Sequence, residues 1–75
     1  MKIKFNKNFY NYSAIKDSIA QFKGIAEFCV SKKGNYFIVS LSKVKEELKD
    51  DVINEFANYV LYLSILKNKQ KEFKV

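Results

Sequence analysis

The sequence lacks histidine altogether, and it contains one cysteine, Cys29, and only two glycines. Without a Cys/His ligand set, a zinc site of the usual type is excluded, and so are Ser-His and Cys-His nucleophile pairs. Two glycines are too few for a P-loop or a dinucleotide-binding loop. We therefore predict that the protein is not an enzyme and that it holds no cofactor and no metal.

Arginine is also absent. All fourteen basic residues are lysines, against eight acidic residues, which gives a net charge of +6. A basic surface attracts phosphate backbones, but the arginine forks that read guanine edges are missing. The chain is rich in Lys, Asn, Ile, Phe and Tyr, whose codons are A/T-rich, so a low-GC genome explains much of the lysine excess. A small basic nucleic-acid-binding or antitoxin-like protein is therefore the alternative interpretation and not the main one.

The length of 75 residues corresponds to one small domain, residues 1–75. The lysine-alternating N-terminus lacks the continuous apolar core of a signal peptide, and a lone cysteine agrees with a reducing compartment, so we expect a cytoplasmic protein. The longest uncharged run, residues 56–66, reaches about half of a bilayer's hydrocarbon thickness as a helix. We expect no membrane partner.

The first half of the chain reads as a strand followed by a helix. Alternation predicts a strand over residues 1–8, with Ile3 and Phe5 on one side. A helix over residues 13–23 follows, with Ser13 as its N-cap and Gly24 at the position of a C′ glycine. Its apolar residues recur at helical spacing.

Two strands and a second helix follow. Residues 25–31 and 36–41 are strand-like runs, and the Lys-Lys-Gly-Asn segment between them predicts a hairpin turn. Ser42 is the expected cap of the last helix, whose early turns carry the dipole-favoured carboxylates Glu46, Glu47, Asp50 and Asp51. A lysine-rich tail from about residue 68 to residue 75 is predicted to be disordered or frayed.

The element order predicts an α+β fold, a β-α-β-β-α domain with two helices packed on one face of a three-stranded sheet. Both faces of the hairpin carry apolar groups, because Ile25, Cys29, Tyr36 and Ile38 point away from its main apolar face. A three-stranded sheet also has two edges with unpaired backbone groups, to which an extended peptide can add as a strand.

The last helix is apolar around most of its circumference in its second half, whereas a helix packed on one sheet needs only a single apolar stripe. We interpret the surplus as a partner interface, in a hetero-complex or a homo-oligomer. The alternative is that the first helix covers it. The candidate interface residues are Phe56, Tyr59, Tyr62, Leu63, Leu66, Tyr36 and Ile38.

Four weaker candidates each have a structural interpretation that we prefer. The four carboxylates of the last helix could bind a hard cation or act as an acid/base pair, but a solvated helix start is favoured. Cys29 is read as packed and inert and not as a reactive thiol. Lys32, Lys33 and Gly34 are read as a turn and not as a phosphate site. Tyr10, Tyr12 and Tyr36 are read as half-buried aromatics and not as stacking platforms.

Two stretches resemble a known family. The run from Phe9 to Ile15 (FYNYSAI), followed by Phe22, resembles the opening pattern of the small accessory subunit of His-Xaa-Ser peptide-maturation systems, the HxsD-like family. The segment from Asn54 to Leu61 (NEFANYVL) resembles the final helix of that family, although this chain continues with more apolar residues. The resemblance implies a non-catalytic accessory or scaffold subunit that binds a radical SAM maturase, its ribosomally made precursor peptide, or both.

Overall fold

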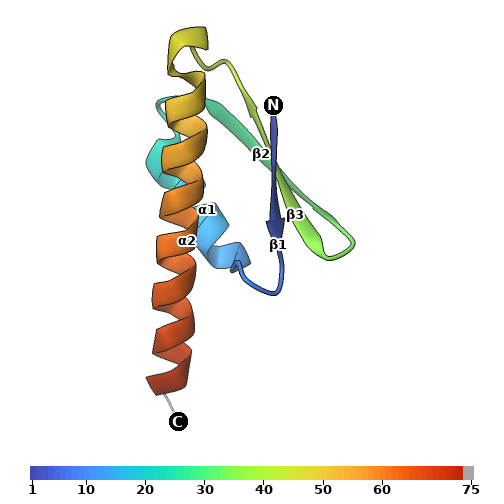
Figure 1. Cartoon of the computed structure of the whole chain (residues 1–75), viewed down its shortest axis with the longest axis vertical. Coiled ribbons are helices and arrows are strands. Elements are labelled where there is room, and N and C mark those ends of the chain that lie inside the picture. Colours follow the sequence, from blue (N-terminus) through green and yellow to red (C-terminus); the bar gives the residue numbers. More distant parts are fainter. Residues whose placement is uncertain (74–75) are drawn as a thin grey trace.

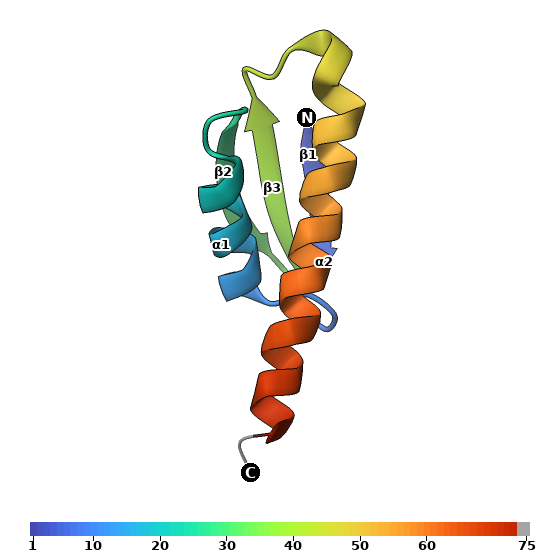
Figure 2. The same ribbon diagram turned by 90° about the vertical axis from the view of Figure 1, so that its left-hand side faces the viewer.

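The computed structural model describes residues 1–73, with side chains as far as Asn68. The elements are β1 (Lys2–Asn6), α1 (Tyr12–Phe22), β2 (Glu27–Lys33), β3 (Tyr36–Ser42), the short 3-10 helix η1 (Glu46–Leu48) and α2 (Lys49–Phe73). Both helices lie on one face of a three-stranded sheet (Figures 1 and 2). The predicted α+β fold and element order are confirmed.

The strand order is β1-β3-β2, with both pairs antiparallel, so that β3 is the central strand. In this register Ile3 lies opposite Val39, and Val39 lies opposite Val30. Because these positions share one face of the sheet, alternate residues of all three strands point toward the helices. The edges are therefore β1 and β2, and the run from Tyr36 to Leu41 is not an edge.

Phe56 of α2 is the centre of the core. It is fully buried and lies against aromatic rings from three other elements, with centroid distances of 4.8 Å to Phe28, 5.5 Å to Phe22 and 6.2 Å to Phe5. The buried hydrophobic cluster around it contains Phe5, Ile15, Phe37, Val39, Leu41, Val52 and Val60. One stripe of α2 therefore covers the sheet, as its helical spacing predicts.

The helix α1 begins at Tyr12, one residue earlier than expected, and its N-cap is Asn11, two residues before the expected cap Ser13. The Asn11 side-chain oxygen accepts hydrogen bonds from the backbone N–H groups of Ser13 and Ala14, at 2.8 and 3.4 Å. Asparagine and serine are similarly good caps, so propensity alone does not choose between them. The choice follows from the β1–α1 loop, which holds Asn11 beside α2.

The two glycines differ in their backbone conformation. Gly34 has a φ of +57°, and with Asn35 it forms a two-residue turn between the paired residues Lys33 and Tyr36. This is the conformation for which glycine is favoured in a tight hairpin. Gly24 directly follows the C-cap residue Lys23, so it lies at the expected C′ position, but it does not have the positive φ that favours glycine there.

The start of the last helix also differs from the expectation. Ser42 is the final residue of β3 and caps nothing, because Lys43 follows with a φ of 58° and turns the chain toward η1. The carboxylates lie in the first turns of η1 and α2, as predicted. The helix α2 continues to Phe73, so it includes most of the tail expected to be frayed; residues 74–75 lie outside the described residues.

Two serines allow α1 and α2 to approach closely. Ser18 of α1 and Ser64 of α2 are both fully buried, and the hydroxyl of Ser18 donates a hydrogen bond to the carbonyl of Ala14 at 2.7 Å. An ion pair between Lys67 and Asp17, at 3.0 Å, joins the same two helices. This contact fixes α1 against one side of α2 and leaves the other side uncovered.

Candidate interaction surfaces

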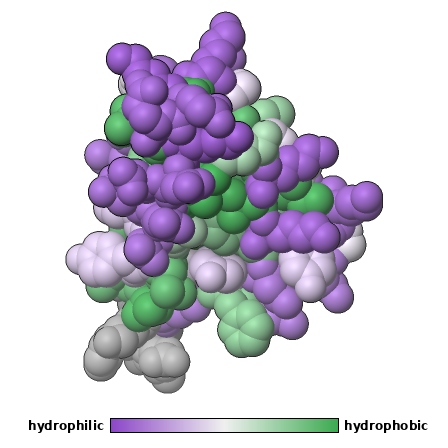
Figure 3. Space-filling view, turned by 45° about the horizontal axis from the view of Figure 1, so that its top comes forward, coloured by the Kyte–Doolittle hydropathy of each residue, from purple (hydrophilic) through white to green (hydrophobic). Residues whose placement is uncertain are grey.

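The exposed side of α2 in its second half is apolar. Leu61, Tyr62, Ile65 and Leu66 are between 39% and 57% exposed, and we call these four residues the α2 apolar face. At 100° per residue they lie on the side of the helix opposite Val60 and Ser64, which are buried. In Figure 3 hydrophobic side chains gather over this part of α2, whereas the η1 end of the molecule is mostly hydrophilic.

The first helix reaches only the margin of this surplus, at Tyr59, and the four residues of the α2 apolar face stay exposed. The contacts of α1 reach Ser64, Lys67 and Tyr59 of α2, through Asn11, Asp17 and Phe22 respectively. In addition, the last turns of α2 extend beyond the sheet and α1 (Figures 1 and 2). The α2 apolar face is therefore left exposed by the rest of the described residues.

The seven predicted interface residues do not form one surface. Phe56 is fully buried, so its assignment to the interface was wrong: its ring fills the centre of the core. Tyr62 and Leu66 belong to the α2 apolar face, and Tyr59 and Leu63 are half-buried at its margin. Tyr36 and Ile38 lie on the face of the sheet away from the helices, so the sheet separates them from α2.

The face of the sheet away from the helices is open and mainly polar. Lysines, serines and Glu27 occupy it together with Tyr36 and Ile38, and the ammonium group of Lys4 lies 5.8 Å from the centroid of the Tyr36 ring. Cys29 is exposed on this face, so the expectation of a packed cysteine was wrong. Its position in β2 follows from alternation, since Phe28 and Val30 point to the core.

A cluster of cations and aromatic rings lies at the hairpin end of the molecule. The ammonium groups of Lys32 and Lys16 are 4.7 and 6.0 Å from the centroid of the Tyr12 ring, and Lys7 is 5.4 Å from that of Phe37. The two rings are 5.3 Å apart. We call the three lysines and Tyr12 the lysine–tyrosine cluster. Cation–π attraction holds these ammonium groups near the rings.

The lysine–tyrosine cluster is electrostatically uncompensated. No carboxylate of the described residues forms an ion pair with any of its three lysines. The first turn of α1, where its partial positive charge lies, contains no acidic residue either. The cluster could not be predicted from the sequence, because its lysines come from a loop, a helix and a strand and no local spacing connects them.

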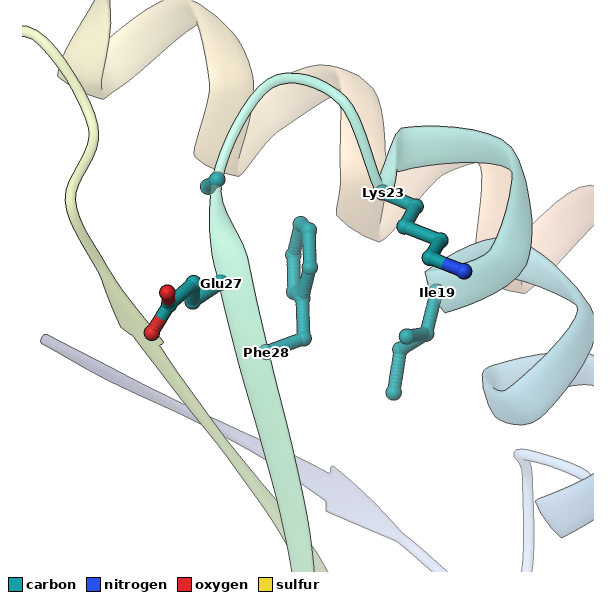
Figure 4. A pocket seen from close by; sticks show the side chains of 5 residues that line it. Ile19, Lys23, Glu27 and Phe28 are labelled. Carbon is teal, nitrogen blue, oxygen red and sulfur yellow. The ribbon is translucent and has the colours of Figure 1, made fainter.

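A shallow depression of about 440 Å³ lies between the end of α1 and the start of β2. Its apolar lining is Ile19, Ala26 and Phe28, and Lys23 stands at its rim (Figure 4). Glu27 also borders it, but its carboxylate forms an ion pair with Lys43 at 3.0 Å. The depression is therefore an apolar site with one lysine beside it.

The described part of the chain offers no metal centre. Within it, no three His, Cys, Asp or Glu side chains gather closely enough to hold an ion. The carboxylates in the first turns of η1 and α2 are exposed to solvent. The same residues include no helix that is both long and apolar enough to span a membrane.

No protein-family model matches the chain, and no curated protein and no solved structure matches it either.

Proposed function

We propose that this protein is a non-catalytic accessory subunit that binds a radical SAM peptide maturase, its ribosomally made precursor peptide, or both, in the cytoplasm. The observation that carries the proposal is the uncovered α2 apolar face. The similarity of residues 9–22 and 54–61 to the HxsD-like family names the system. Nothing in the proposal requires chemistry from this chain.

The α2 apolar face has the form of a helix recognition surface. Leu61 and Ile65 are four residues apart, as are Tyr62 and Leu66, so each pair stands on one side of the helix. Helix-in-groove complexes are anchored by side chains at this spacing. Large exposed apolar patches are uncommon on monomers and mark binding surfaces. The maturase is the proposed occupant, and a second copy of the chain is the occupant when the maturase is absent.

The proposal requires a radical SAM enzyme encoded beside this chain, and the experiment is co-purification of the two proteins. The double variant Tyr62→Glu/Leu66→Glu places two charges in the interface, so we expect it to keep its circular dichroism spectrum and to lose the complex. The control Ala20→Glu/Asn54→Glu adds the same charge at two exposed positions outside the face. It is expected to retain the complex.

Self-association is measured in parallel by light scattering. Wild-type protein is expected to dimerise at high concentration, and the Tyr62→Glu/Leu66→Glu variant is expected to remain monomeric. The proposal would be refuted if the wild-type chain stayed monomeric and did not bind the products of its neighbouring genes. A gene neighbourhood with a toxin in place of a radical SAM enzyme would favour the antitoxin-like alternative.

A further inference from the structure

The outer side of β2 is an unpaired sheet edge. The backbone of Leu41 in β3 exchanges hydrogen bonds with Met1, and the carbonyl of Asn35 accepts one from the N–H of Lys7. The backbone N–H and C=O groups of the odd-numbered residues of β3 therefore point toward β1. The even-numbered residues of β3 therefore bond to β2, through register partners such as Ser31. Because this pattern alternates, the peptide groups of Phe28, Val30 and Lys32 point outward. No strand pairs with them within residues 1–73.

Two distinct environments lie along this edge. At the start of β2, the apolar depression of Ile19, Ala26 and Phe28 opens between the strand and α1 (Figure 4). At the other end of β2, Lys32 belongs to the lysine–tyrosine cluster. Phe28 and Lys32 are four residues apart on the same side of the strand, a distance of about 13 Å. An extended chain paired with β2 therefore places two of its own side chains, four residues apart, in these two environments.

We propose that the β2 edge binds an extended polypeptide as a fourth strand. An apolar side chain of this polypeptide occupies the depression, and a carboxylate four residues away lies at the lysine–tyrosine cluster. Backbone pairing supplies the affinity, and the two side-chain positions supply the specificity. The identity of the polypeptide as a precursor peptide rests on the proposed function, whereas the site itself consists of residues outside the α2 apolar face.

The same observations favour a polypeptide over a nucleic acid. Single-stranded nucleic acids bind through aromatic faces on which bases stack, but the ammonium groups of Lys32 and Lys16 already lie over the Tyr12 ring. Nucleic acid also makes no use of an unpaired strand edge. Carboxylates, by contrast, match both the ammonium groups and the partial positive charge at the start of α1, whose first turn holds no acidic side chain.

The test uses the full chain and fluorescein-labelled pentapeptides in an anisotropy titration. Leu-Thr-Val-Thr-Glu and Glu-Thr-Val-Thr-Leu present the pattern in the two strand directions. We expect one of them to bind, and to lose at least tenfold in affinity when Leu becomes Ser or Glu becomes Lys. N-methylation of one alternating set of its peptide nitrogens should cost at least tenfold, and methylation of the other set less than twofold, because only one set faces β2.

Charge-matched protein variants complete the test. Lys16→Gln/Lys32→Gln is expected to weaken binding at least fivefold, and Lys2→Gln/Lys45→Gln, which removes the same charge elsewhere, less than twofold. The proposal would be overturned if the two double variants lost equal peptide affinity, or if N-methylation of either set of nitrogens had no effect. It would also be overturned if neither peptide bound, or if an oligothymidylate bound more tightly than the peptides. The Tyr62→Glu/Leu66→Glu variant should bind the peptide normally, so failure of the maturase complex and failure of this site are separate results.

Discussion

The backbone N–H of Asn11 donates a hydrogen bond to the hydroxyl oxygen of Ser64, 3.0 Å away and 53 positions later in the chain. The side chain of Asn11 caps α1 at the same time. One residue thus connects the β1–α1 loop, the start of α1 and the middle of α2. The orientation of α2, and with it the direction in which its apolar face points, depends on this junction.

Replacement of Ser64 by alanine should therefore destabilise the domain. The partly buried N–H of Asn11 loses its acceptor, and an unsatisfied buried donor costs about 1–2 kcal/mol. Urea unfolding followed by circular dichroism measures the change. Ser31→Ala, at an exposed position of β2, is the control and should stay within about 0.5 kcal/mol of wild type.

The cap of α1 makes a second prediction. Asn11→Ala should cost about 1 kcal/mol in unfolding free energy, and Asn11→Asp should cost much less because aspartate is an equally good cap. Ser42→Ala should have little effect, since Ser42 ends β3 and caps no helix. A larger loss from Ser42→Ala than from Asn11→Ala would contradict the assigned helix starts.

Core and surface positions of α2 should respond very differently to truncation. Phe56→Ala removes a fully buried ring that contacts three others, so a loss of about 3–5 kcal/mol is expected, enough to unfold much of a small domain. Leu61→Ala removes a side chain that is 41% exposed and should cost well under 1 kcal/mol in the isolated chain. Thermal melts at equal protein concentration measure the loss of stability in each variant, and similar losses would contradict the assignment of Phe56 to the core and Leu61 to the surface.

The two glycines provide a matched pair. Gly34→Ala forces a side chain into a left-handed conformation and should destabilise the hairpin by about 1 kcal/mol. Gly24→Ala meets no atom within 4 Å and no positive φ, so it should be neutral or stabilising by up to about 1 kcal/mol, through a less flexible unfolded chain. Similar destabilisation by both changes would show that Gly24 also requires a backbone conformation that favours glycine.

The elements of the fold could be predicted from sequence because each has a local cause. Alternation places Ile3 and Phe5 on the core side of β1, and the Gly34-Asn35 pair supplies the turn between β2 and β3. The helix starts were less predictable. Two good caps, Asn11 and Ser13, lie two residues apart, and only the contact with Ser64 distinguishes them.

The candidate sites were only partly predictable for a related reason. The surplus of apolar residues on α2 is visible in its helical periodicity, but which side of the helix meets the sheet depends on the position of α1. For that reason Phe56 was assigned to the interface, although it lies in the core. The lysine–tyrosine cluster and the α1–β2 depression each combine residues from separate elements, so only the folded chain reveals them.

The central position of β3 also sets the order of events during synthesis. The strand β1 is translated first, yet its closest register partner, Tyr36, lies thirty positions beyond Asn6. At ribosomal rates of about 5–20 residues per second, β1 waits for seconds without a partner, while the β2–β3 hairpin can close in microseconds once it emerges. Lys2 and Lys4 alternate along the waiting strand and oppose its association with other nascent chains until β3 arrives.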